Sequence, residues 1–195
     1  MRLRVPLSLR ICALASLAFP VSVHAATPDL LISDREFTDV STMDIGDVQK
    51  FFAERTSPLA TTYLPDSGGN LKFPSEIIWF AAVEARINPQ VLLTTLQKEQ
   101  RLVTNAKPTA RQVDYAMWYG CPDGSGCNDR FRGFGKQVRG AALQLRGYLD
   151  DLATKGETIA RWSVGRTKQT GDGFAVTPQN AATAALYTYT PWQGS

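Results

Sequence analysis

Two helical segments joined at one break constrain the fold more than any other feature of this sequence. Pro74 opens the first segment, because proline is favoured in the first turn of a helix, and helical spacing continues to about residue 86. Asn88-Pro89 then ends this helix and starts another, which extends to about residue 103. Any fold of this chain therefore has to accommodate two consecutive helices, 74–86 and 89–103.

The rest of the chain also predicts mainly helices. One of them follows Ser41-Thr42, which can cap a helix, and carries apolar residues at helical spacing. The helices expected outside the first pair are 44–55, 109–117, 136–152 and 177–187. Residues 58–70 predict a long loop, whereas 162–176 alternate weakly around the turn residues 170–173 and predict a small hairpin. The fold class is therefore mostly α, an α+β fold with a minor β element.

The first 25 residues have the layout of a secretory signal peptide. Arg2, Arg4 and Arg10 precede or open an apolar run, and small residues precede Ala26, where we expect cleavage. The chain has 195 residues, and the remainder after cleavage has the size of a single domain. We divide it into an N-terminal accessory arm with a short helix, 26–72, and a helical domain, 73–195. We expect a secreted or periplasmic protein.

Cleavage also changes the net charge of the chain. The whole sequence has 21 basic and 18 acidic residues, and the loss of three arginines makes the two counts equal. A neutral chain lacks the basic excess that binding to phosphates requires, so we expect no nucleic-acid partner. No later apolar run approaches the roughly 18 residues of a membrane span, so we expect no span either.

The removed segment also contains the single histidine, His24. Without it the mature chain has no histidine for a catalytic triad or a metal site, so we expect no metal and no cofactor. Carboxylates are then the expected acid-base groups. Cys12 is removed as well, which leaves Cys121 and Cys127 as a pair that we expect to form a disulfide in an oxidising compartment.

Glu99 is the strongest candidate for a reactive side chain. On a helical wheel it lies near Leu92, Leu96 and Val103, on the side expected to face the core. Burial among leucines disfavours the charged carboxylate and raises its pKa, which is the property of a general acid. The alternative is that the helix ends here, so that Glu99 turns to water or pairs with Arg101.

Glu84 is the second glutamate on an apolar stripe, after Ile77 and Ala81. Arg86 is close to it, and no segment that resembles a ligand-binding loop follows. We therefore expect Glu84 to form a structural salt bridge.

Several blocks of the sequence resemble the lysozyme-like lytic transglycosylases. Residues 81–100, from Ala81-Ala82 to Lys98-Glu99-Gln100, are similar to the helix-break-helix that carries the catalytic glutamate of that family. Residues 133–137, Gly-Phe-Gly-Lys-Gln, are similar to its glycine-aliphatic-glutamine motif, and 141–148 to the helix that follows. The whole run 75–192 resembles a group of secreted bacterial lysozyme-like domains found in cell-wall or haemagglutinin-labelled proteins.

The resemblance implies cleavage of the β-1,4 glycan strand of peptidoglycan, with Glu99 as the acid that protonates the glycosidic oxygen. A lytic transglycosylase can use this one carboxylate as acid and then as base, whereas a muramidase or glucosaminidase-type hydrolase needs a second carboxylate. The candidates for that second group are Asp114, Asp123 and Asp129. The family usually has serine after the glutamate, and this chain has Gln100 instead.

The resemblance also implies a sugar-binding cleft around these motifs. Flat aromatic rings with polar tips suit the faces and hydroxyls of amino sugars. The residues expected to bind substrate are Gln100, Tyr119, Phe134, Gln137, Tyr187 and Tyr189. Core packing is an equal alternative for Tyr187, and the disulfide loop 121–127 is expected at the rim of the cleft.

The sequence is also compatible with a function of a different class, binding without catalysis. A non-catalytic module that keeps the fold and binds cell-wall glycan fits the neutral charge equally well. An enzyme of this kind could also serve a secretion system or act as an exported toxin with an immunity-protein partner, and these roles share the same chemistry.

Overall fold

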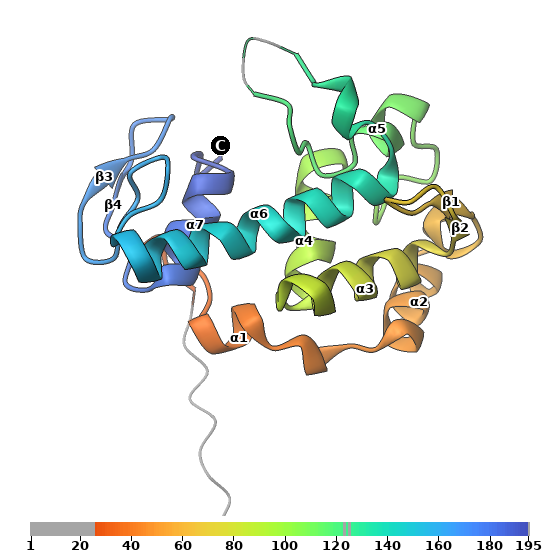
Figure 1. Cartoon of the computed structure of the whole chain (residues 1–195), viewed down its shortest axis with the longest axis horizontal. Helices are drawn as coiled ribbons and strands as arrows, with labels where there is room; N and C mark the ends of the chain where they lie inside the picture. The colour runs from red at the N-terminus through yellow and green to blue at the C-terminus, as the bar shows by residue number, and fades with distance from the viewer. Residues whose placement is uncertain (1–25, 123, 125, 195) are drawn as a thin grey trace, which may run out of the picture.

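In the computed structural model the described residues are 26–122, 124 and 126–194, so the expected signal peptide lies outside them. These residues form seven α-helices and two antiparallel sheets of two strands each (Figure 1). The helices are α1 (Asp34–Thr38), α2 (Ile45–Glu54), α3 (Pro74–Ala85), α4 (Pro89–Gln100), α5 (Ala110–Asp114), α6 (Phe134–Lys155) and α7 (Ala181–Tyr189). The strands are β1 (Leu64–Pro65), β2 (Leu71–Lys72), β3 (Lys168–Gln169) and β4 (Ala175–Val176). The prediction of a mostly helical fold with a small β element is confirmed.

The break between α3 and α4 lies where the sequence predicts it. Arg86 ends α3 in the left-handed conformation, with φ of 52°. The buried side chain of Asn88 then caps α4, because its Oδ1 accepts a hydrogen bond of 2.8 Å from the amide of Gln90. Asn88 Nδ2 also donates to the carbonyl of Glu36, which joins the break to α1.

Helix α6 crosses the middle of the molecule and packs against α3 and α7 (Figure 1). The apolar residues that it buries include Val138, Ala141, Ala142 and Leu145. Its first turn lies against the β1–β2 hairpin, since a Cβ at Gly135 would lie 2.4 Å from the backbone of Asp66. Only glycine allows this approach, which gives the glycine of the 133–137 motif a packing reason.

The segment expected as an accessory arm is part of the main core. Phe37, Val48, Phe52 and Leu59 lie in the same buried cluster as the residues of α3, α4 and α6. The arm also contains elements that the sequence did not predict, namely α1 and the β1–β2 hairpin within the expected loop. The N-cap of α2 is Asp44, which accepts from the amide of Asp47, rather than Ser41-Thr42.

The C-terminal part combines the predicted hairpin with the last helix. Strands β3 and β4 pair antiparallel around the expected turn, with Gln169 opposite Ala175. Helix α7 begins after Asn180, whose side chain caps it, three residues later than Thr177-Pro178 predicts. Trp162, Val176, Ala184 and Tyr187 form a second, smaller core between the hairpin and α7.

None of the helices in the described part of the chain is both long and apolar enough to span a bilayer.

Candidate active site at Glu99

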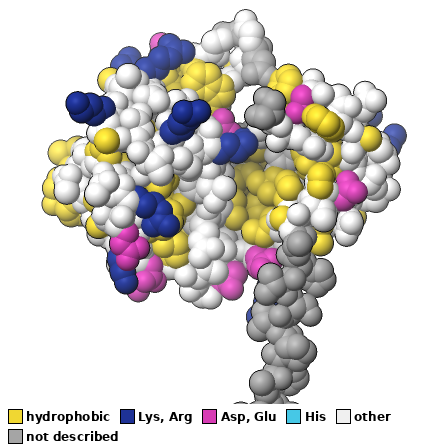
Figure 2. Space-filling model, turned by 180° about the vertical axis from the view of Figure 1, so that it is seen from behind, with side chains coloured by type: hydrophobic (Ala, Val, Ile, Leu, Met, Phe, Trp, Pro, Cys, Tyr) yellow, Lys and Arg dark blue, Asp and Glu magenta, His cyan; other side chains and the backbone are white. Residues whose placement is uncertain are grey.

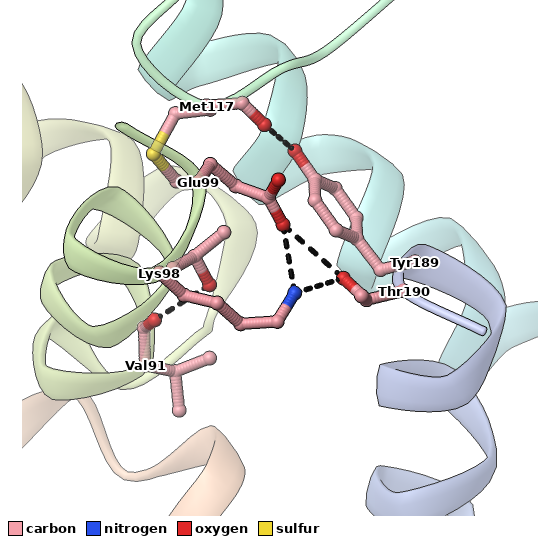
Figure 3. A network of polar contacts seen from close by, with 7 residues as sticks. Val91, Lys98, Glu99, Met117, Tyr189 and Thr190 are labelled. Atoms are coloured by element: carbon pink, nitrogen blue, oxygen red, sulfur yellow. Dashed lines mark hydrogen bonds and ion pairs between the residues drawn. The ribbon is translucent and has the colours of Figure 1, made fainter. Parts of the chain in front are cut away.

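Glu99 lies in the last turn of α4, which ends at Gln100 because Arg101 adopts the left-handed conformation. Its side chain is 16% exposed, so the carboxylate is largely enclosed, as predicted. Its polar neighbours differ from the expected shell of leucines. Lys98 Nζ lies 2.8 Å from Glu99 Oε1, and Thr190 Oγ1 lies 3.2 Å from the same oxygen (Figure 3). The expected alternative partner, Arg101, is exposed.

Tyr189 forms the wall beside this carboxylate (Figure 3). Its hydroxyl donates a hydrogen bond of 2.6 Å to the carbonyl of Met117. Burial raises the pKa of Tyr189 well above its usual range, and the negative charge of Glu99 raises it further. The hydroxyl therefore stays protonated, and Tyr189 is a neutral group next to Glu99 whose proton is bonded to Met117.

A third element, α6, contributes Gln144 and Tyr148. The Nε2 of Gln144 donates to the hydroxyl of Tyr148 at 2.5 Å. Burial raises the pKa of Tyr148 to about 12, and its charged form would also repel those of Tyr119 and Tyr189. Two further tyrosines, Tyr119 in the loop before α6 and Tyr148 of α6, therefore lie near Tyr189.

The face that carries α4 and α7 is hollowed. Figure 1 shows both helices on the same side of α6, and Figure 2, from behind, shows hydrophobic side chains gathered in a hollow near the middle of that face. Lys98 and Thr190 connect the ends of α4 and α7, because Lys98 Nζ lies 2.5 Å from Thr190 Oγ1. An apolar surface with a few polar groups is the usual composition of a small-molecule binding site.

Gln137 and Phe134 have roles that differ from the predicted contact with substrate, because both side chains are buried. The Nε2 of Gln137 donates to the carbonyls of Tyr119 and Phe131, and its Oε1 accepts from the amides of Met117 and Tyr119. This amide therefore holds the loop before α6 in place. Phe134 packs in the main core.

The other residues expected to bind substrate are divided between the site and the core. Tyr119 lies in the loop before α6, and its ring packs on Phe131 with centroids 4.7 Å apart. Tyr187 is buried and stacks on Trp162 with centroids 5.0 Å apart, as the core-packing alternative predicts. The carbonyl of Gln100 accepts a hydrogen bond from Gln112.

The remaining carboxylates have partners of their own. Arg132 binds Asp114 through Nε and Nη2, both at 2.8 Å, and Asp129 accepts a hydrogen bond from the hydroxyl of Tyr115. Asp123 lies outside the described residues. Glu84 forms the expected salt bridge, but with Arg139 of α6 rather than with Arg86. That contact lowers the pKa of Glu84 and ties α3 to α6.

The predicted disulfide between Cys121 and Cys127 is present. It closes the loop between α5 and α6, whose backbone also contacts Gln137 on its N-terminal side. The buried amide of Gln137 therefore holds the backbone on both sides of the disulfide loop, at Tyr119 and at Phe131.

Two further hollows lie away from Glu99. One, of about 510 Å³, lies between α2 and α4 and includes Met43, Phe51 and Leu93 in its lining. The other, of about 390 Å³, lies between the β1–β2 turn and the start of α6 and includes Asp66 and Lys136.

Lys98, Thr190 and Tyr148 are site residues that sequence reasoning did not select. Lys98 could have been noticed, because it precedes Glu99 in the sequence. Thr190 gives no comparable signal, since it is 91 positions away from Glu99 and reaches it only through the packing of α7. Tyr148, in the helix expected at 136–152, lies near Tyr189, a proximity that depends on how α6 and α7 pack.

Comparison with known proteins gives one match. The family model described as LasA, N-terminal domain, matches residues 30–190, which includes both the arm and the helical domain. No curated protein and no solved structure matches the chain.

Proposed function

The chain belongs to the family of LasA N-terminal domains, and from that premise and the residues around Glu99 we propose that it cleaves the β-1,4 glycan strand of peptidoglycan. The description of the family names no reaction, so the proposal depends on the site. The resemblance of residues 75–192 to lysozyme-like domains supports the substrate class. The signal-peptide layout and the disulfide support a secreted or periplasmic location.

The observation that carries the proposal is the placement of Glu99. Its carboxylate is largely enclosed between the ends of α4 and α7, where Lys98 and Thr190 contact it and the neutral Tyr189 lies beside it. A carboxyl group in such a position can give a proton to a glycosidic oxygen and stabilise the charge that develops as the bond breaks.

The proposed reaction is that of a lytic transglycosylase. Protonated Glu99 gives its proton to the glycosidic oxygen, and the bond between this oxygen and the anomeric carbon breaks. The resulting carboxylate then takes the proton of the 6-hydroxyl of the same sugar, whose oxygen bonds to the anomeric carbon and closes a 1,6-anhydro ring. Glu99 ends the cycle protonated, so no second acid is needed.

The surroundings of Glu99 favour this route over hydrolysis. Two of the three candidate second carboxylates are held by other partners, Asp114 by Arg132 and Asp129 by the hydroxyl of Tyr115. A hydrolase of the retaining kind needs a second carboxylate close to the first. Hydrolysis with Asp114, Asp123 or Asp129 is therefore the alternative reaction.

A module that binds wall glycan without cleaving it is the second candidate function. The ion pair with Lys98 favours it, because an ammonium group in contact with the carboxylate stabilises the negative charge, whereas a general acid has to start protonated.

Digestion of purified sacculi tests the proposal. The mature chain, residues 26–195 with the disulfide formed, should release soluble fragments with 1,6-anhydro ends, detected by mass spectrometry. Glu99→Gln should lower the rate by about a thousandfold, because it removes the acid-base group, and should still sediment with sacculi. Glu84→Gln is the matched control, because Glu84 pairs with Arg139 on the surface, and it should retain activity.

Each other outcome assigns a different function. Reducing ends would replace the transglycosylase with a hydrolase. Binding without fragments, with equal binding by Glu99→Gln, would make the protein a glycan-binding module.

A further inference from the structure

All contacts of the Glu99 carboxylate are made through one of its oxygens. Oε1 lies 2.8 Å from Lys98 Nζ and 3.2 Å from Thr190 Oγ1, whereas Oε2 receives no hydrogen bond from the part of the chain that the structure describes. A threonine hydroxyl has one donor proton and can accept as well. Thr190 therefore accepts from Lys98 and donates to Oε1, which closes a ring of three contacts (Figure 3).

Backbone hydrogen bonds hold Thr190 on the side opposite to α4. Its amide donates to the carbonyl of Leu186 in the last turn of α7. Beyond it, the carbonyl of Pro191 accepts from the amide of Gly171 in the β3–β4 turn. The amides of Gln193 and Gly194 both donate to the carboxylate of Asp172 in the same turn. The hairpin thus anchors the chain that follows α7 and fixes the position of the Thr190 hydroxyl.

We propose that Thr190, together with Lys98, is a positioning residue that binds Oε1 of Glu99 and so makes Oε2 the oxygen that exchanges the proton with substrate. This inference rests on the proposed function, because it states which atom of Glu99 reacts. Neither residue contacts the reacting bond. Both act by holding the carboxyl group in one orientation, with the free oxygen available to the glycosidic oxygen first and to the 6-hydroxyl afterwards.

The chemistry explains why one oxygen has to be held. A carboxyl group that is free to rotate presents its proton in many directions, and misplacement by about 1 Å can lower a rate a hundredfold. Two donors on Oε1 also disfavour protonation of that oxygen. A proton on Oε1 would point toward the protons of Lys98 and Thr190 and repel them. The proton is then carried by Oε2.

Two substitutions at one position test this inference. Thr190→Val keeps the shape of the side chain and removes the hydroxyl, whereas Thr190→Ser keeps the hydroxyl. With soluble peptidoglycan strands as substrate, Thr190→Val should lower kcat between roughly tenfold and a hundredfold and leave KM within about twofold. Thr190→Ser should have a kcat within about threefold of that of the unsubstituted protein. An unchanged kcat in Thr190→Val, or equal losses in both variants, would overturn the inference.

A measurement without substrate separates this inference from the proposed function. The carboxyl carbon of Glu99, labelled with ¹³C and assigned by its loss in Glu99→Gln, reports its hydrogen bonds through its NMR chemical shift. The shift should move in Thr190→Val and return in Thr190→Ser, with equal unfolding midpoints showing that both variants fold. If the chemical shift of Glu99 is unchanged in Thr190→Val, the contact between Thr190 and Glu99 is refuted, even if the protein cleaves glycan. If the chemical shift changes but the protein releases no fragments, only the proposed function is refuted.

Discussion

At the scale of single residues, the number of internal partners distinguishes structural polar groups from reactive ones. Gln137 is fully buried, and both ends of its amide are occupied by backbone groups. Glu99 is 16% exposed, and its Oε2 receives no hydrogen bond from the residues that the structure describes. A buried polar group with every partner satisfied stabilises the fold, whereas a polar group with one unused atom is available for chemistry.

Tyr148 predicts how stability changes at alkaline pH. Its pKa is about 12 in the folded chain and 10 in its unperturbed form, so its contribution is fully present below pH 10 and is lost as the pH rises towards 12. The contribution is about 3 kcal/mol of unfolding free energy. Tyr148→Phe removes the titrating group, so urea titrations across this pH range should show a shallower decline than in the unsubstituted protein.

The exposed Tyr63 supplies the control for this pH dependence. Tyr63→Phe should leave the decline of the unfolding free energy with pH unchanged. Equal declines in Tyr148→Phe and Tyr63→Phe would show that burial of Tyr148 does not set the alkaline limit.

At the scale of elements, the first two turns of α6 position the segments that lie next to the site. Gly135 allows the β1–β2 hairpin to approach, Gln137 holds the loop before α6, and Gly140 leaves room for the ring of Tyr119. A Cβ at Gly140 would lie 2.3 Å from the ring of Tyr119, so any other residue there would displace the tyrosine. The loop that carries Tyr119 and the disulfide thus takes its position from this helix.

Gln137→Leu is the prediction at this scale. Leucine fills the space but leaves the amides of Met117 and Tyr119 and the carbonyls of Tyr119 and Phe131 without the side-chain partner. The expected cost is about 3 kcal/mol of unfolding free energy, measured by urea denaturation. Gln90→Leu, on the exposed side of α4, should change stability by less than about 0.5 kcal/mol. A cost below that of Gln90→Leu would mean that the loop does not depend on Gln137.

At the scale of the whole molecule, the chain from residue 26 onward contributes to one main core. Phe37 of α1 is fully buried, and the start of α7 is bonded to the arm through Asp34, whose Oδ1 accepts from the amide of Ala182. The family match over 30–190 includes the same segment. The arm therefore has to be present for the helical domain to be stable.

Phe37→Ala tests this dependence. Deleting a fully buried phenylalanine should cost about 3 to 5 kcal/mol of unfolding free energy, measured by chemical denaturation. Phe80→Ala is the control, because Phe80 is 55% exposed on α3, and it should cost less than about 1 kcal/mol. Equal costs would show that the arm packs too loosely to support the core.

Most of the local structure of this protein could be predicted from its residues. The helix break at Asn88-Pro89, the long helix α6, the hairpin turn at 170–173 and the enclosure of Glu99 depend on capping residues, turn residues and helical periodicity, which act over a few positions. The disulfide followed from there being only two cysteines after the expected cleavage. The two-residue strands of the β1–β2 hairpin and the five-residue α1 are too short for periodicity to predict.

The contacts between distant residues, in contrast, depend on how the helices pack. Thr190 reaches Glu99, Arg139 replaces Arg86 as the partner of Glu84, and the arm joins the core through contacts between distant positions. Sequence also grouped Gln137 and Phe134 with the substrate-binding residues, although packing buries both. The physical reason is that helical periodicity gives the face on which a side chain lies, whereas its partners depend on which helices pack against that face.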